Sequence, residues 1–247
     1  MNVKEYGSSG RQTIMLLHGG GLSWWSCREA AEHLAEDYHV VLPVLDGHAE
    51  SENDFTGIED NAARLISYID ERFGGSVLMI GGLSLGAQIL VEMLSKRKDI
   101  CSFAMVESAL ALPMNVTYHL TGPMINMSYG LIKKRWFSRL QFRSLRLKAD
   151  LYDDYYRDTC AITKQNMIAF LKANARYELK PSLADTEAEV CIAVGQKEQR
   201  IMRKSAQRLH SVVPGSRLDI MRSMHHGEFS VNHAEEYAQY VRRLIEK

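Results

Sequence analysis

A serine near the middle of the chain stands in a setting typical of a nucleophile. Ser84 is the centre of G-L-S-L-G over residues 82–86, which matches the pattern G-x-S-x-G. An apolar run at residues 77–80 precedes this motif, and a helical pattern follows it. A sharp turn from strand to helix exposes the serine hydroxyl, and the helix N-terminus offers free N–H groups to negative charge. The motif therefore predicts nucleophilic chemistry at Ser84.

Two further segments contain residue types that a nucleophilic serine needs. Residues 18–21, H-G-G-G, end an apolar pattern at 13–17, and glycines there let a backbone N–H approach a developing oxyanion. Residues 224–228, M-H-H-G-E, follow the last predicted strand. A triad in the order serine, acid, histidine needs its base late in the chain. We therefore predict His226 as the base, with His225 as the second choice.

The acid of such a triad has three candidates. Glu198 follows the predicted strand at 190–194, and a carboxylate in that loop would orient the histidine and fix its tautomer. It precedes His226 by enough chain for one helix and one strand. Glu107, at the end of the predicted strand 102–106, is the rival, and Glu228 is the third choice. We predict Glu198.

The elements that must position these residues alternate in type. Strand patterns and helical patterns follow one another, the strands at 13–17, 38–43, 76–80, 102–106, 189–194 and 217–221, and the helices at 26–36, 58–73, 84–96, 200–212 and 234–245. Such alternation implies right-handed crossovers and an α/β fold with a mostly parallel sheet. The predicted nucleophile, acid and base would then meet at the carboxyl ends of the strands.

One long segment breaks the alternation. Residues 109–185 show no strand period and indicate several helices, with turns at Pro113, at Gly122-Pro123 and at Pro181. We predict a core domain formed by residues 1–108 and 186–247, and a helical cap, or lid, formed by the insertion 109–185. A cap in this position would cover the strand ends.

Composition excludes several classes of protein. The chain has 247 residues with 30 Lys and Arg against 30 Asp and Glu, and this zero net charge argues against a nucleic-acid-coating protein. No apolar run reaches the roughly 20 residues of a transmembrane segment, and the first residues lack a signal-peptide layout. The four scattered cysteines indicate neither a zinc site nor a disulfide framework. We expect a cytoplasmic protein without a metal or cofactor.

The motifs together resemble the α/β-hydrolase superfamily over nearly the whole chain except the insert. The segments that carry the resemblance are H-G-G-G at 18–21, L-D-G-H-A-E-S at 45–51, G-L-S-L-G at 82–86, G-Q-K-E at 195–198, and His226. The resemblance implies a sheet of six to seven strands flanked by helices. It also implies Ser84 as nucleophile, His226 as base, and the backbone N–H groups of Gly20 and Leu85 as oxyanion hole.

Two departures from the family pattern stand out. Family members commonly have Asp where this chain has Glu198, and the loop that begins at Asp46 is shorter than usual and contains Ala49. Glutamate is one methylene longer, so its loop must sit further back. The loop at Asp46 is structural, so neither departure removes the predicted chemistry.

The predicted activity is hydrolysis of a carboxylic ester through an acyl-enzyme. The alternatives are C–C bond hydrolysis or acyl transfer on the same triad, or a catalytically idle fold that binds a ligand. We expect a small-molecule substrate, an apolar acyl ester, with Gly21, Leu22 and Trp24 as its contacts. Further apolar side chains expected in that pocket are Trp25, Met114, Met124 and Met127. The oligomeric state stays open.

The insert also contains a basic stretch. From Ser108 to Ala149 there is no Asp or Glu, whereas seven cations lie in residues 133–148 and an acidic run follows at 150–158. One interpretation is a solvated helix whose cations pair with that acidic run. The other is a surface that binds an anionic substrate, a membrane surface or an acidic carrier protein.

Overall fold

A seven-stranded sheet forms the centre of the protein. The computed structural model describes residues 1–246, and its strands follow the order β1-β3-β2-β4-β5-β6-β7. The strands are β1 Val3–Tyr6, β2 Thr13–Leu17, β3 His39–Pro43, β4 Val77–Leu83, β5 Cys101–Glu107, β6 Glu189–Gly195 and β7 Arg217–Met221. All neighbours run parallel except β1, which pairs antiparallel with β3. The predicted mostly parallel sheet of six to seven strands is confirmed.

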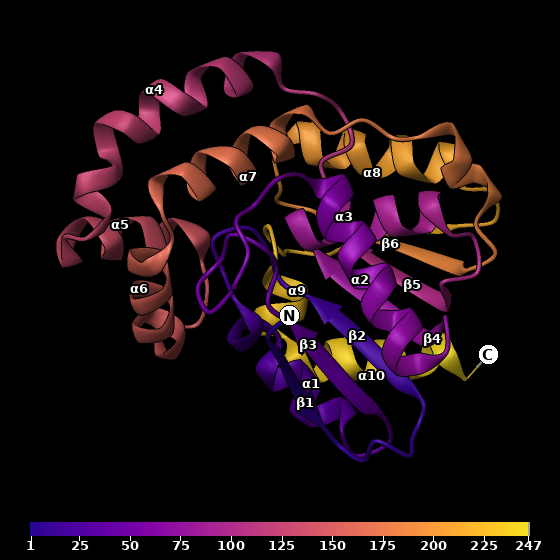
Figure 1. Ribbon diagram of the computed structural model, residues 1–247. Helices are drawn as coiled ribbons and strands as arrows, with labels where there is room; N and C mark the ends of the chain where they lie inside the picture. The colour runs from indigo at the N-terminus through magenta and orange to yellow at the C-terminus, as the bar shows by residue number, and fades with distance from the viewer. Residues whose placement is uncertain (247) are drawn as a thin grey trace.

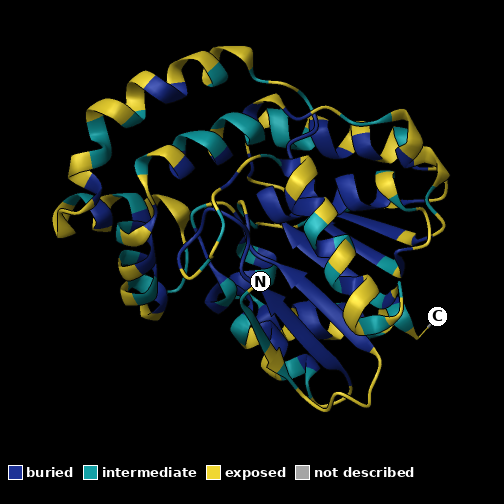
Figure 2. Cartoon of the chain, viewed as in Figure 1, coloured by how far each residue is buried: buried dark blue, intermediate teal, exposed yellow. Residues whose placement is uncertain are grey.

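Helices cover both faces of this sheet, each over its own apolar core (Figure 1). One core packs α1 Arg28–Leu34 and α10 Ala234–Ile245 against side chains such as Ile14 and Met79. The other packs α2 Ile58–Phe73, α3 Leu85–Lys96 and α8 Arg200–Val212 against the opposite side chains, such as Met15 and Ile80. Figure 2 shows the central strands buried over most of their length, with exposure only near the starts of β4, β5 and β6, as expected for a parallel sheet covered on both faces.

The N-terminal strand is one element that the sequence patterns did not predict. β1 has only four residues, and its backbone pairs with β3 alone, from Val3 opposite Pro43 to Tyr6 opposite Val40. Half-buried edge strands of this length show too few alternations to stand out from a loop. The strand nevertheless extends the sheet beyond β3.

Residues between β5 and β6 form four α-helices rather than strands. They are α4 Asn115–Ile132, α5 Arg135–Leu145, α6 Tyr152–Ala161 and α7 Lys164–Arg176. In Figure 1 they lie beyond the end of the sheet toward which the strand arrowheads point. We call residues 109–185 the helical insert. No helix within residues 1–246 is long and apolar enough to span a bilayer.

The predicted turn at Gly122-Pro123 is wrong, because α4 continues through both residues. A proline inside a helix removes one backbone hydrogen bond and costs roughly 3 kcal/mol. Here Thr121 and Gly122 are buried where α4 packs along α7, and this packing offsets the cost.

Short helices complete the chain. They are the 3-10 helices η1 Trp24–Cys27, η2 Ala149–Leu151 and η3 Pro181–Asp185, and the single-turn helix α9 Glu228–Asn232. η1 directly follows the glycine loop after β2, and α9 directly follows the two adjacent histidines. Both therefore lie beside the carboxyl ends of the parallel strands.

Candidate active site

The turn from β4 into α3 holds Ser84 in a strained backbone conformation. Its φ is +54° and its ψ is −110°, a region that residues with a Cβ rarely adopt. A Cβ at Gly82 would lie 2.6 Å from the Gly86 carbonyl oxygen, and one at Gly86 would lie 2.4 Å from the Leu17 carbonyl oxygen. Gly86 therefore lets α3 begin close to the end of β2, and Gly82 lets β4 end close to the first turn of α3. The turn leaves Ser84 half-buried among buried neighbours.

A histidine and a carboxylate meet at the same edge of the sheet. Glu198 follows β6 and His226 follows β7, and Glu198 Oε2 lies 2.8 Å from His226 Nδ1. The Glu198 side chain is fully buried, whereas the His226 side chain is 46% exposed. The carboxylate thus accepts the Nδ1 proton, which leaves Nε2 of the neutral ring free to accept another.

The carboxylate of Glu198 has two further donors. The hydroxyl of Ser108 and the backbone N–H of Gly195 both donate to Oε1, each over 2.7 Å. Burial alone would raise the pKa of Glu198, but the bond from His226, its positive charge and these two donors together hold the pKa below its ordinary value. Glu198 therefore stays ionised while it orients the imidazole. No sequence pattern pointed to Ser108, which is recognisable only because β5 and β6 are neighbours.

Ser84 and His226 border two pockets in common. Their side chains are not joined by a hydrogen bond within residues 1–246, yet both line a pocket of about 120 Å³ and a second of about 310 Å³. In apo enzymes such contacts are often long and tighten only around substrate. A reacting group that enters either pocket reaches both side chains.

The glycine loop after β2 lies beside the turn at Ser84. A Cβ at Gly20 would lie 3.5 Å from Cβ of Leu85, so the two residues are neighbours. The backbone N–H groups of Gly20 and Leu85 donate no hydrogen bond to any group of residues 1–246. Two free donors at the N-terminal end of α3 are suited to hold an oxyanion.

Two buried histidines hold that loop in place, a role that sequence reasoning missed. His48 Nε2 accepts from the Gly21 N–H over 3.0 Å, and its Nδ1 bonds the Asp46 carbonyl. His18 Nε2 likewise accepts from the Leu45 N–H over 3.1 Å. Burial lowers the pKa of His48 to about 4 and that of His18 to about 3, with His48 also disfavouring charge on His18. Both rings are therefore neutral acceptors at neutral pH.

The alternative candidates for acid and base lie elsewhere. His225 Nδ1 contacts Glu228 Oε2 over 3.2 Å, and its backbone N–H donates to the same oxygen over 2.7 Å. Glu107 is buried at the end of β5. Its Oε1 accepts from the Ser230 N–H over 3.4 Å, and its Oε2 has no partner within residues 1–246. Neither Glu107 nor Glu228 is hydrogen-bonded to His226.

Glu107 should make stability depend on pH. Burial raises the pKa of Glu107 from 4.5 to about 7, so between these values the native state keeps a proton that the unfolded state releases. The free energy of unfolding then falls as pH rises through this range. Glu107→Gln cannot ionise, so at pH 8 relative to pH 4 it should gain up to about 3 kcal/mol over the wild type. Urea unfolding at both pH values measures this difference.

Glu52→Gln is the matched control for that measurement. Glu52 is exposed and forms no ion pair within the described residues, so its replacement should shift the two unfolding curves equally at both pH values. If the free energy of unfolding of Glu107→Gln relative to the wild type were the same at both pH values, the assignment of a buried, protonated carboxyl would be contradicted.

The walls of the two pockets come from both the sheet edge and the insert. The smaller pocket is mainly apolar, and its walls are Gly19, Gly20, Leu22, Leu83, Ser84, Leu145, Leu147, His226 and Gly227. The larger pocket is lined by Ser84, Leu110, Met114, Asn174, Glu198, Gln199, Ile201, Met202 and His226. Leu145 and Leu147 belong to the insert, so the insert closes one side of the smaller pocket.

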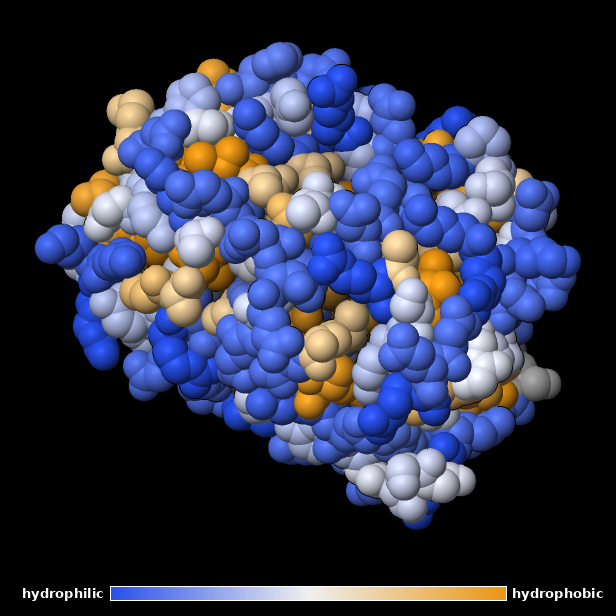
Figure 3. Space-filling view, viewed as in Figure 1, coloured by the Kyte–Doolittle hydropathy of each residue, from blue (hydrophilic) through white to orange (hydrophobic). Residues whose placement is uncertain are grey.

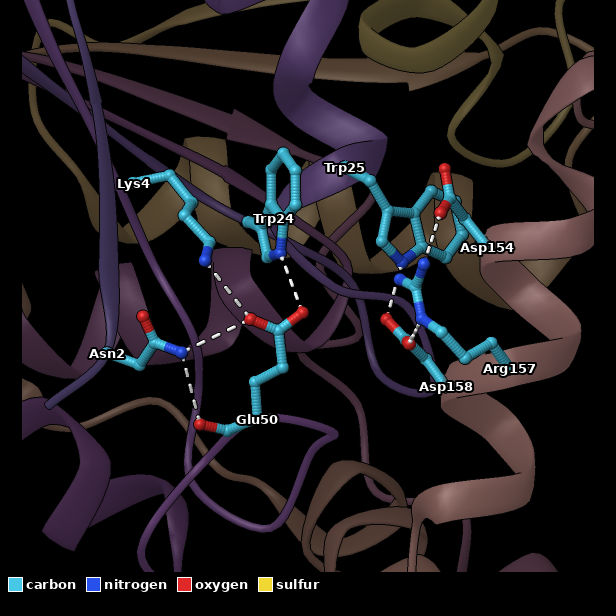
Figure 4. Close-up of polar contacts among 8 residues, drawn as sticks. All are labelled: Asn2, Lys4, Trp24, Trp25, Glu50, Asp154, Arg157 and Asp158. Atoms are coloured by element: carbon cyan, nitrogen blue, oxygen red, sulfur yellow. Dashed lines mark hydrogen bonds and ion pairs between the residues drawn. The ribbon is translucent and has the colours of Figure 1, made fainter.

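Several residues expected in the pocket lie elsewhere. Trp24 donates its indole N–H to Glu50 over 3.2 Å, under the ammonium of Lys4, and lines neither pocket (Figure 4). Met124 and Met127 of α4 face solvent with 62% and 86% of their surface exposed. Gly21 uses its N–H on His48, as described above. Leu22 lines the smaller pocket and Met114 lines the larger one.

Trp25 connects the glycine-loop side of the site to the insert. Its indole N–H donates to Asp158 Oδ2 over 2.7 Å, and both side chains are buried (Figure 4). Arg157 Nε donates to the other oxygen of Asp158 over 2.6 Å. This places α6 of the insert in direct contact with η1 of the core.

A second buried contact fixes α7 to α3. Gln88, one turn after Ser84, donates from Nε2 to the carbonyls of Leu110 and Asn174 over 2.7 and 3.0 Å. The Asn174 amide donates back to Gln88 Oε1 over 2.8 Å.

Within residues 1–246, no group of three or more His, Cys, Asp or Glu side chains is arranged to hold a metal ion.

Comparison with known proteins identifies the family of the chain. The profile of the alpha/beta hydrolase family matches residues 14–241. The chain therefore belongs to the α/β-hydrolase family. Among curated protein sequences none matches the chain.

Solved structures share the fold at low sequence identity. An esterase from Thermogutta terrifontis is 15% identical with a TM-score of 0.79, over 99% of this chain and 92% of that one. An enol-lactonase from Burkholderia xenovorans is 12% identical with a TM-score of 0.82, over 100% and 96% of the two chains. MenH from S. aureus is 15% identical with a TM-score of 0.78, over 99% and 97%. At these identities the likeness concerns the fold.

Proposed function

We propose that the protein is a serine hydrolase that cleaves carboxylic esters through Ser84, His226 and Glu198. The observation that carries the proposal is the 2.8 Å contact between Glu198 and His226, on a histidine that borders the same two pockets as the strained Ser84. Family membership and esterase neighbours of the same fold support hydrolase chemistry.

The reaction would run in two halves. His226 Nε2 accepts the Ser84 proton as the hydroxyl oxygen attacks the ester carbonyl, and Glu198 stabilises the imidazolium. The N–H groups of Gly20 and Leu85 hold the tetrahedral oxyanion, a contribution of about 2.7–4 kcal/mol for each donor. His226 then gives the proton to the leaving alcohol. Water, activated by the same ring, releases the acid and restores Ser84.

The insert acts as a lid in this proposal. Leu145 and Leu147 form part of the smaller pocket, so the insert contributes directly to substrate contact. The two pockets meet at Ser84, which suits an ester whose acyl and alcohol parts extend to opposite sides. The apolar wall of Leu22, Leu83, Leu145 and Leu147 favours an apolar group in the smaller pocket.

A substrate series combined with an active-site label tests the proposal. Purified protein should hydrolyse p-nitrophenyl esters, with a rate that changes with acyl chain length, and a fluorophosphonate should attach covalently to Ser84. Mass spectrometry of peptides identifies the labelled residue. Ser84→Ala should take up no label. A folded protein that neither hydrolyses these esters nor takes up the label would indicate an idle fold that binds a ligand.

The alternatives on the same triad enter as further substrates. A lactone is a cyclic ester, and one structural neighbour is an enol-lactonase, so lactones belong in the series. Label uptake without turnover of any ester or lactone would favour C–C bond hydrolysis or acyl transfer.

Replacement of each of the two buried glutamates by glutamine tests which one is the acid. Glu198→Gln should lower kcat roughly 10⁴-fold, because the amide orients the imidazole in the wrong tautomer. Glu107→Gln should stay within several-fold of the wild type, since Glu107 makes no hydrogen bond to His226. Steady-state turnover of the two variants is measured side by side. A disabled Glu107→Gln beside an active Glu198→Gln would transfer the role to Glu107.

A further inference from the structure

The longest helix of the insert presents an apolar stripe to solvent. Val116, Leu120, Met124, Met127 and Leu131 of α4 are all exposed, Met127 by 86%. At 3.6 residues per turn, these five positions fall within an arc of roughly 80°. The opposite side of α4, which includes Thr121 and Ile132, is buried. The stripe is therefore a continuous outer face, which we call the α4 stripe.

Neither α4 nor α5 contains a negative side chain. α4 itself contains no Asp, Glu, Lys or Arg, and α5 adds exposed Trp136 and Leu140. Orange and pale atoms interrupt the blue surface over the insert at the left of Figure 3. Exposed apolar surface gathered in this way marks an interaction site.

Cations border this apolar surface and mostly lack carboxylate partners. Of the seven in residues 133–148, Arg135 pairs with Asp153 at 4.0 Å and Lys148 pairs with Glu29. The rest have no ion pair within residues 1–246, namely Lys133, Lys134, Arg139, Arg143 and Arg146. Arg135 alone pairs with the acidic run among the described residues, so that run does not balance the basic stretch as a whole.

Two carboxylates of the acidic run have partners outside the basic stretch. Asp154 pairs with Arg157 at 2.7 Å and with Arg28 at 3.8 Å. Asp158 pairs with Arg157 and accepts from Trp25. Arg157, Arg28 and Trp25 therefore hold Asp154 and Asp158. No ion pair within residues 1–246 balances the charges of Lys133, Lys134, Arg139, Arg143 and Arg146.

We propose that this face of the insert docks on an anionic lipid surface. The α4 stripe and Trp136 would enter the boundary between headgroups and acyl chains, while the unpaired cations contact anionic headgroups. A second copy of the chain fits less well, because a twofold contact would bring the same cations against one another. The proposal does not depend on which ester the active site cleaves.

Vesicle sedimentation tests the docking with the whole protein. The wild type should co-sediment with vesicles of phosphatidylcholine and phosphatidylglycerol, and far less with phosphatidylcholine alone. Raising ionic strength from about 0.1 M to about 1 M shortens the Debye length from about 10 Å to about 3 Å, so most binding should be lost. Equal binding to both vesicles at every salt concentration would overturn the electrostatic half of the proposal.

Two pairs of variants separate charge from apolar contact. Lys133→Gln with Lys134→Gln should lower vesicle affinity roughly 25-fold, about fivefold for each cation. Lys204→Gln with Arg208→Gln removes the same charge from the exposed side of α8 and should change affinity little. Met124→Ser with Met127→Ser should lower affinity at least tenfold. The control for this double variant is Ile220→Ser, because Ile220 of β7 is also apolar and 53% exposed but lies outside the insert.

Other occupants of this face would give different results. If the wild type does not bind anionic vesicles but binds soluble polyglutamate, and Lys133→Gln with Lys134→Gln abolishes that binding, the face would be assigned to an acidic protein. Wild type that ignores vesicles but loses a dimer in Met124→Ser with Met127→Ser would assign it to a second copy. Either result overturns the proposal. Hydrolysis of a soluble ester should be unchanged in all four variants, so docking and catalysis are judged separately.

Discussion

Replacement of Ser84 by alanine is expected to abolish ester hydrolysis and to leave the fold intact. Without the hydroxyl no acyl-enzyme forms, and loss of a triad nucleophile costs on the order of 10⁶ in kcat. Steady-state turnover and fluorophosphonate labelling measure the loss. Circular dichroism and the thermal midpoint report whether the protein remains folded. Full turnover by well-folded Ser84→Ala would exclude the proposed mechanism.

Ser84→Gly is a matched partner for that variant. Both lack the hydroxyl, but only alanine keeps a Cβ at φ +54° and ψ −110°, where the backbone is strained. Ser84→Gly should therefore be as inactive as Ser84→Ala and more stable by about 1 kcal/mol. Equal inactivity at different stability separates the lost chemistry from any loss of fold.

His226→Ala is expected to lose nearly as much activity as the serine variant. Among the described residues, His226 is the one base that borders both pockets. Triad members act as a unit, so a single loss approaches the full cost, roughly 10⁶ in kcat. Because the His226 side chain is 46% exposed, added imidazole should restore part of the activity of His226→Ala. Turnover with and without imidazole is the measurement.

His225→Ala controls for the neighbouring ring. His225 contacts Glu228 rather than Glu198, so its loss should reduce turnover only several-fold. If His225→Ala were the inactive variant and His226→Ala the active one, the base would be the adjacent residue and the geometry around Glu198 would need another explanation.

Strong periodicity explains which elements the sequence predicted well. The helices at 58–73, 200–212 and 234–245 match the structure at both ends, because each has a clear apolar face against the sheet. The turn at Ser84 was equally clear, since its glycines are fixed by close backbone contact. Local signals of this kind need no knowledge of the rest of the chain.

The misses depend on contacts between distant segments. Gly122 and Pro123 look like a turn until α7 packs beneath them, and nothing near residue 48 shows that His48 will bond Gly21. Ser108 reaches Glu198 only because β5 and β6 are neighbours in the sheet. The sequence predicts Met124 and Met127 in a pocket because apolar residues are usually buried. Exposure of a whole helix face is the exception.

The bond between Trp25 and Asp158 limits how the insert can move as one body. A rigid swing of the whole insert would break this 2.7 Å contact and leave a carboxylate in a dry setting with one donor fewer. Gln88 fixes α7 in the same way. These two contacts hold α6 and α7 to the core, and neither contact involves α4 or α5. Because Leu145 of α5 lines the smaller pocket, we expect access to that pocket to change by movement of α5 and α4 rather than by a swing of the whole insert.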